Sequence, residues 1–112
     1  DVYKRQLDAC AVKENAKCEA YYTPEQDGLD QPWTGRVWCN PPYGRNVGQW
    51  VKKAHDTASG GGFVVMLLPA RTDTRWFHDY IYGKTEVKFG SCQNAAPFPS
   101  MVVIFGGEHK NE

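Results

Sequence analysis

The order of apolar and polar residues along the chain predicts strands that alternate with helices. Residues 63–68 form an uninterrupted apolar run, Phe-Val-Val-Met-Leu-Leu, which is typical of a strand covered on both faces in a mainly parallel sheet. Residues 46–59 change to the helical period and place their apolar side chains on one face, and three glycines at 60–62 end that helix. The centre of the chain therefore reads as an amphipathic helix followed by a buried strand.

The flanking segments extend this pattern in both directions. Residues 72–82 predict a short helix capped by Thr72 or Asp73 and ended by Gly83. Its apolar face consists of Trp76, Phe77, Tyr80 and Ile81. Further strands are expected at residues 7–12, 18–23, 35–40, 85–89 and 101–105. We therefore expect an α/β fold, a three-layer sandwich with an open, mostly parallel sheet.

The composition limits the class of protein. A chain of 112 residues suits one small domain, and its 41% apolar and 13% aromatic residues are typical of a globular core. Thirteen basic and thirteen acidic residues cancel, which argues against a protein that coats nucleic acid. The balance is uneven, because residues 36–88 carry eight basic and four acidic side chains, whereas residues 1–35 carry four and seven. The basic part is therefore the middle of the chain.

The longest apolar run is far shorter than the roughly 18 residues that a membrane span needs, and residues 1–30 do not read as a signal peptide. We expect no membrane association and a cytoplasmic location. The four cysteines, Cys10, Cys18, Cys39 and Cys92, contain no Cys-x-x-Cys pair, so we expect reduced structural thiols rather than a zinc module. The three histidines are scattered, and we expect no metal site.

The most informative residues are Asn40-Pro41-Pro42-Tyr43, directly after the strand expected at residues 35–40. A chance match to such a motif in this chain has odds of about 3 in 1000. In open α/β sheets, ligands bind beyond the carboxyl ends of the strands, which is where this turn lies. The Asn40 side-chain oxygen and a proline carbonyl are two acceptors for a planar amino group, and Tyr43 offers a ring for stacking.

At these residues the sequence resembles a known family. The motif matches the [DN]-P-P-[YFW] motif of amino-group methyltransferases that use S-adenosylmethionine, and its surroundings are similar to the phage-type DNA N6-adenine methyltransferases. The similar stretches are Leu7-Asp8-Ala9-Cys10-Ala11, Asn15-Ala16-Lys17-Cys18, Tyr22-Thr23, Asp27-Gly28-Leu29, Trp33, Gly35-Arg36-Val37-Trp38-Cys39-Asn40-Pro41-Pro42-Tyr43-Gly44, Leu68-Pro69-Ala70-Arg71-Thr72-Asp73-Thr74 with Trp76 and His78, and Ala96-Pro97-Phe98-Pro99-Ser100.

This resemblance implies a Rossmann-like class I methyltransferase core that transfers a methyl group to the N6 amino group of a flipped adenine in DNA. By the same resemblance, the catalytic residues would be Asn40, Pro41, Pro42 and Tyr43. The cofactor-binding residues would be Asp8, Cys10, Ala11, Asp27 and Leu29, although the glycine-rich cofactor turn usual in such folds is absent after residues 7–11. The DNA-binding residues would be Arg45, Arg71, Thr72, Asp73, Thr74 and Arg75.

Residues 7–107 are expected to form a single, partial catalytic domain, with residues 108–112 as a tail. Residues 1–6 do not resemble the family, and we expect a non-native leader there and a missing upstream segment. The expected setting is a bacterial host cell with a phage or prophage gene for DNA modification. Two alternatives stay open from the sequence: a non-catalytic remnant that binds nucleic acid or cofactor, and a methyltransferase acting on N4 of cytosine or on another amino group.

Overall fold

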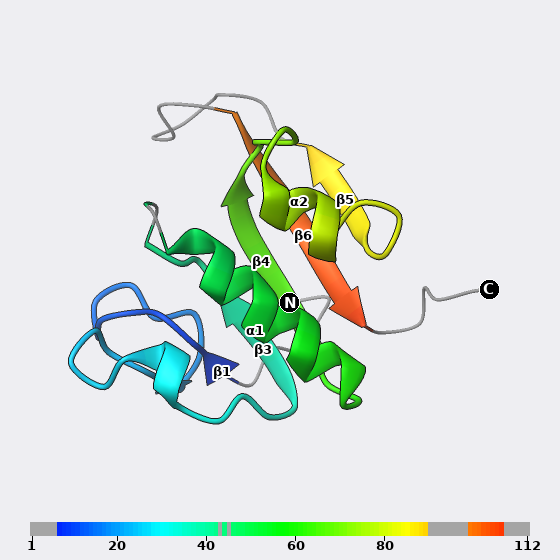
Figure 1. Cartoon of the computed structure of the whole chain (residues 1–112). Helices are drawn as coiled ribbons and strands as arrows, with labels where there is room; N and C mark the ends of the chain where they lie inside the picture. Colours follow the sequence, from blue (N-terminus) through cyan, green and yellow to red (C-terminus); the bar gives the residue numbers. More distant parts are fainter. Residues whose placement is uncertain (1–6, 43, 45, 90–98, 107–112) are drawn as a thin grey trace.

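A computed structural model describes residues 7–42, 44, 46–89 and 99–106 of the chain. Strands and helices alternate through its centre, as the apolar pattern predicts (Figure 1). The described elements are β1 (Leu7–Asp8), β2 (Ala20–Tyr21), the short 3-10 helix η1 (Gly28–Asp30), β3 (Arg36–Cys39), α1 (Val47–Ser59), β4 (Phe63–Pro69), α2 (Arg75–Tyr80), β5 (Glu86–Phe89) and β6 (Ser100–Gly106).

The strands form one six-stranded sheet in the order β2-β1-β3-β4-β6-β5. The pairs β2–β1, β1–β3 and β3–β4 are parallel, whereas β6 runs antiparallel to both β4 and β5. The sheet is therefore mostly parallel, as predicted. Because β1, β3 and β4 run in one direction, their carboxyl ends meet at the same edge.

The main core lies between this sheet and α1. The buried face of α1 carries Val47, Trp50, Val51 and Ala54, the positions that the helical period selects. Alternate side chains of β4 and β6 pack against them, and Met66, Leu68, Met101, Val103 and Phe105 are all almost fully buried. Among the described residues, no helix combines the length and the apolar composition needed to cross a bilayer.

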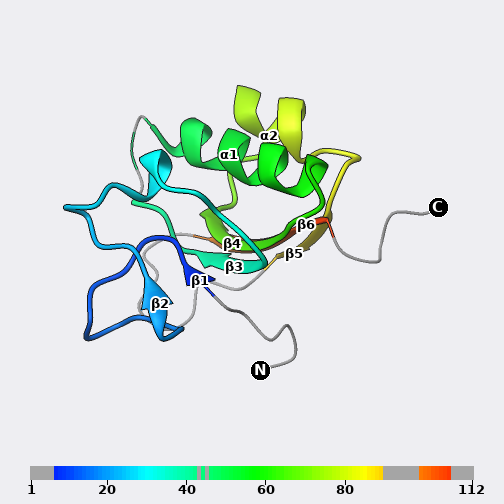
Figure 2. The same cartoon turned by 90° about the horizontal axis from the view of Figure 1, so that it is seen from below.

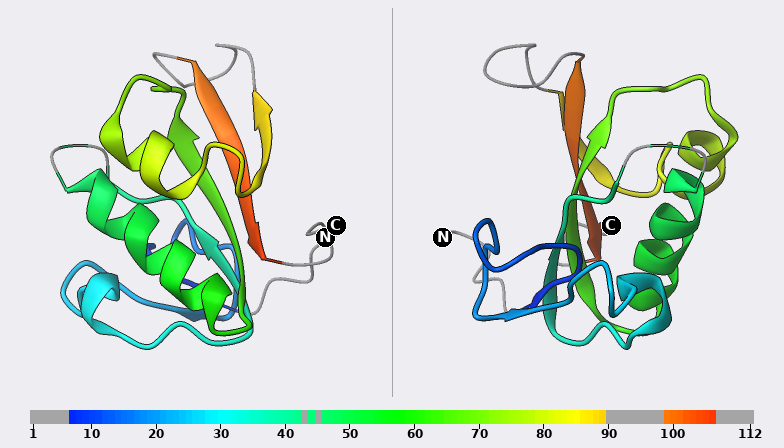
Figure 3. Two further views of the ribbon diagram at one scale, coloured as in Figure 1. Left: turned by 45° about the vertical axis from the view of Figure 1, so that its right-hand side comes forward. Right: turned by 90° about the vertical axis from the view of Figure 1, so that its left-hand side faces the viewer.

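The described helices cover only one face of the sheet (Figure 2), and the two side views in Figure 3 agree. The expected three layers are therefore two in the described part of the chain. In a three-layer sandwich, the connection from β1 to β2 would supply a helix on the other face. Here that connection is an irregular loop, residues 9–19, because hydrogen bonds fold it back onto the end of β1.

Several element boundaries differ from the sequence prediction. The first strand ends at Asp8 rather than near residue 12, so Cys10 lies in the following turn and not inside a strand. The second strand is similarly reduced to two residues. The cap of α2 is Thr74, whose Oγ1 accepts a hydrogen bond from the Phe77 amide at 3.3 Å, and not Thr72 or Asp73. The same hydroxyl donates to the Arg71 carbonyl at 2.8 Å, which stabilises the turn before the helix.

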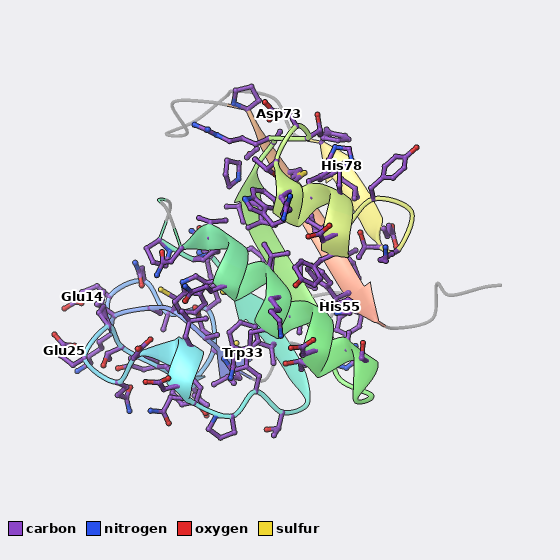
Figure 4. The ribbon with its side chains drawn as sticks, in the orientation of Figure 1. Glu14, Glu25, Trp33, His55, Asp73 and His78 are labelled. Carbon is purple, nitrogen blue, oxygen red and sulfur yellow. The ribbon has the colours of Figure 1, made fainter. Side chains whose placement is uncertain are left out.

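The loop from β2 to β3 packs against both α1 and the end of β1 at Gly28. A Cβ atom at Gly28 would overlap the Ala9 carbonyl oxygen and lie 3.2 Å from the Trp50 ring. Trp33 of the same loop donates its indole N–H to the Gly28 carbonyl at 2.9 Å and packs against Trp50, with the ring centroids 6.0 Å apart and the rings tilted by 33°. Figure 4 shows Trp33 beside α1. This packing holds the loop close to the carboxyl edge of the sheet.

Candidate active site

The Asn40-Pro41-Pro42 turn begins directly after the last residue of β3, Cys39. Neither proline has an N–H group to donate, so the strand cannot continue through them. Pro41 is buried, whereas Asn40 and Pro42 are exposed. The buried ring anchors the turn, and the amide side chain before it stands at the accessible carboxyl edge of the sheet.

Two predicted residues of this region, Tyr43 and Arg45, lie outside the described residues. Gly44 between them is described and is exposed. The stacking role expected of Tyr43 and the DNA contact expected of Arg45 therefore stay predictions from the sequence.

Asp8 ends the neighbouring strand and is 1% exposed. The β1–β3 register places Asp8 opposite Trp38, two residues before Asn40. Its carboxylate accepts two backbone hydrogen bonds, from the Cys10 amide to Oδ1 at 3.2 Å and from the Lys17 amide to Oδ2 at 2.8 Å. Asp8 thus closes the β1–β2 loop and holds it over the edge where Asn40 emerges.

Residues of these two turns line one partly open cavity of about 270 Å³, just below the range of roughly 300–1,000 Å³ that is typical of ligand pockets. Five predicted residues from the two turns line it: Asp8, Cys10 and Ala11 after β1, and Asn40 and Pro42 after β3. Its other lining residues are Val12, Asn15, Lys17, Pro24 and Trp38. The structure therefore brings the predicted catalytic and cofactor-binding turns together around a shared space.

Cys10 lines the cavity as a free thiol, and Cys39 is a free thiol buried at the end of β3. Cys92 lies outside the described residues. Burial, and then the negative charge of Asp8, raise the pKa of Cys10. Burial raises the pKa of Cys39 further, with smaller contributions from Cys10 and Asp8. Because the thiolate is the reactive form, both cysteines stay protonated and unreactive near neutral pH.

Asp27 and Leu29 lie apart from this cavity. Asp27 has a left-handed backbone with φ 58°, and its Oδ1 accepts a hydrogen bond from the Leu29 amide at 3.2 Å, so it caps η1. Leu29 packs on the core and lines a different groove beside α1. The structure does not bring these two residues together with Asp8 and Asn40.

The predicted DNA-binding segment follows β4 at the same carboxyl edge as Asn40. Arg71, Thr72, Asp73 and Arg75 are exposed, and Thr74 is half-buried in its role as the cap of α2. Figure 4 shows Asp73 on the connection between β4 and α2. None of these residues lines the cavity, so the DNA contacts expected of them stay predictions from the sequence.

The sequence of the chain matches a model of one known protein family. The model of the family described as DNA N-6-adenine-methyltransferase (Dam) matches residues 2–98. The chain belongs to this family. The Dam match includes both turns of the cavity and the segment after β4, and it begins within residues 1–6.

Two phage proteins named DNA N-6-adenine-methyltransferase are similar to this Dam-family chain. The protein of Escherichia phage T1 is 38% identical over 86 residues, which is 75% of this chain and 36% of the relative. The protein of Haemophilus phage HP1 (strain HP1c1) is 33% identical over 87 residues, 77% of this chain and 50% of the relative. The chain therefore spans a third to a half of these relatives. No solved structure matches it significantly.

The sequence prediction missed five residues that line the cavity in this Dam-family chain. Trp38, Asn15 and Lys17 fall inside stretches that resemble the family, so the sequence contained a signal for them. Val12 and Pro24 carry no such signal, because only the folding of their loops brings them to the site.

Within the described residues, no group of three or more His, Cys, Asp or Glu could hold a metal ion, and His55 and His78 come from separate helices (Figure 4).

Proposed function

We propose that the chain is the part of an adenine-specific DNA methyltransferase that holds the target amino group and the methyl donor S-adenosylmethionine. The observation that carries this proposal is the shared cavity, in which Asn40 and Pro42 face the same space as Asp8 and Cys10. Membership of the Dam family supports the choice of adenine N6 as the acceptor. The strand order, with an antiparallel β6 between β4 and β5, supports a Rossmann-like class I core.

The residues around the cavity fit this methyl donor. Ala11 and Val12 provide apolar wall, and the Asp8 carboxylate favours the positive charges of the donor, its sulfonium and its ammonium. When bound, S-adenosylmethionine supplies an electrophilic methyl group. Asp8, Cys10 and Ala11 would hold it from the side of β1, opposite the Asn40 turn.

The Asn40 side-chain oxygen and the Pro41 carbonyl would accept the two N–H groups of the adenine amino group. These bonds would draw the nitrogen lone pair out of conjugation with the ring and leave the nitrogen more nucleophilic toward the methyl group that the donor supplies. The donor would supply the methyl group as its C–S bond breaks and the new N–C bond forms, and the nitrogen would then release one proton to water. The residues contribute orientation and hydrogen bonding, and none needs to form a covalent intermediate.

Asn40 is exposed at the carboxyl edge, but adenine inside a duplex keeps its amino group within the stack. The base must therefore flip out, at a cost of a few kcal/mol, and Tyr43 is suited to stack on it. Arg45, Arg71 and Arg75 would bind the phosphates around the flipped base, while Thr72, Asp73 and Thr74 lie within the same DNA-facing connection. Both relatives are phage proteins, which supports action on DNA in the cytoplasm of a bacterial host.

The test is methyl transfer by the 112-residue chain from tritiated S-adenosylmethionine to unmethylated duplex DNA. Asn40→Ala should lower the rate by about 100-fold or more, as expected when one preorganised hydrogen-bonding group is removed at a reacting centre. Because Asn40 is exposed, the melting temperature of the Asn40→Ala variant should stay close to that of the unchanged chain. Gln49→Ala is the matched control, because Gln49 is an exposed amide side chain on α1. This variant should keep full activity.

Mass analysis of the digested product identifies the modified base. N6-methyladenine is the expected product, and N4-methylcytosine would reject adenine as the acceptor. Full transfer by Asn40→Ala would reject the proposed role of the turn. If the unchanged chain binds the donor and transfers nothing, the chain is a binding remnant.

A further inference from the structure

The loop from β1 to β2 replaces a glycine-rich turn with a closed polar loop at the cavity. The Lys17 amide donates to Asp8 Oδ2 at 2.8 Å, and the Val12 amide donates to Asn15 Oδ1 at 3.0 Å. These two bonds fix both halves of the loop, and Cys10, Ala11, Val12, Asn15 and Lys17 line one side of the cavity. Lys17 is thus a lining residue whose backbone is tied to Asp8.

The cavity lining contains two charged side chains, Asp8 and Lys17. Asp8 is buried and accepts hydrogen bonds from the loop, whereas Lys17 is exposed and makes no ion pair with another described residue. A ligand that placed a second cation at Lys17 would be repelled, and a ligand with a carboxylate there would gain a charge-assisted hydrogen bond. The wall thus offers one negative and one positive charge, the complement of an amino-acid zwitterion.

We propose that Lys17 binds the α-carboxylate of the methionine part of S-adenosylmethionine and selects cofactors that carry this group. The inference rests on the proposed function, since it assigns one end of the same ligand in the same cavity. Asp8 carries the opposite charge to Lys17, and it favours the ammonium and sulfonium groups of the same ligand. Lys17 is thereby a specificity-determining residue and takes no part in the transfer of the methyl group.

The experiment compares two ligands that differ only in the carboxylate, S-adenosylmethionine and its decarboxylated form. Both are titrated calorimetrically into the 112-residue chain and into Lys17→Met, which keeps the aliphatic stem and loses the charge. The unchanged chain should bind S-adenosylmethionine about tenfold more tightly than the decarboxylated ligand, as expected for one hydrogen bond between charged groups. Lys17→Met should bind the two ligands equally, and Lys17→Arg should keep the preference.

Lys13→Met is the matched control, because Lys13 is exposed on the same loop and does not line the cavity. It should retain the full preference for the carboxylated ligand. The inference is overturned if Lys17→Met keeps the preference for the carboxylated ligand, or if it binds both ligands more weakly by the same factor. Loss of DNA affinity with unchanged cofactor affinity would assign Lys17 to a phosphate and overturn it too. If the unchanged chain binds neither ligand, the proposed cofactor site itself is wrong.

Discussion

Asp8 is the one charged side chain buried among the described residues, and its surroundings explain how the fold tolerates it. A buried carboxylate needs hydrogen-bond donors, and the Cys10 and Lys17 amides provide them. The sequence identifies Asp8 only as an acidic residue at the end of a predicted strand. Its backbone partners follow from the path of the loop, which no local pattern predicts.

Asp8→Asn should lower the free energy of unfolding by about 1–3 kcal/mol. The amide that replaces the carboxylate has one acceptor oxygen, so one of the two backbone N–H groups loses its partner. Urea unfolding at pH 7 measures the change, and hydrogen exchange should accelerate at the Cys10 or Lys17 amide. Asp56→Asn is the control, since Asp56 is an exposed partner of Lys52 and its loss should leave stability almost unchanged. Equal stability of the two variants would contradict the role given to Asp8.

At the scale of elements, the sequence predicts well the long segments with a clear apolar pattern. The predicted helix at residues 46–59 is α1, and the apolar run at residues 63–68 is β4, extended by Pro69. Short elements are predicted less well, because β1 and β2 are strands only where a neighbouring strand pairs with them. The cap of α2 is Thr74 and not the predicted Thr72 or Asp73, because the Thr74 hydroxyl bonds both the Phe77 amide and the Arg71 carbonyl.

Gly28 shows how an element depends on a close approach that the sequence does not reveal. Gly28→Ala should destabilise the chain by about 1–3 kcal/mol, because the added Cβ must displace the Ala9 carbonyl or the Trp50 ring. Gly60→Ala is the matched control, since its Cβ would meet nothing closer than 3.7 Å and its φ of −88° suits any residue. Thermal unfolding of both variants measures the difference. A Gly28→Ala chain as stable as Gly60→Ala would show that the loop does not need this contact.

At the scale of the whole molecule, the balanced net charge conceals a basic segment that reaches the carboxyl edge of the sheet. Arg71 is exposed on the connection that follows β4, and Arg75 is exposed at the first position of α2. The strand β4 pairs with β3, which the Asn40 turn follows. A surface of this kind binds phosphates without reading bases. The proposed DNA contact is therefore electrostatic and should depend on salt.

Replacing both Arg71 and Arg75 by Ala should weaken DNA binding for every sequence. The slope of log K against log salt should fall by about 0.9 for each phosphate contact that is lost. Fluorescence anisotropy between 50 and 200 mM salt, roughly the range over which such contacts weaken, gives the slope. The control replaces Lys52 and Lys84, of which Lys52 lies within α1 and Lys84 precedes β5, away from that edge. An unchanged slope in the double arginine variant would exclude the segment from the DNA interface.

The sequence by itself determined the elements whose patterns are local, such as α1, β4 and the end of β3 at its prolines. It also predicts a role for Asn40 in holding an amino group, because the motif lies within a few residues. The tertiary structure decided which residues share the cavity. Parallel pairing of β1 with β3 brings Asp8 beside the Asn40 turn, whereas the cap at Asp27 holds that residue and Leu29 apart from it. Local propensity acts over neighbouring residues, but a site is assembled by strand pairing and loop closure between segments distant in the chain.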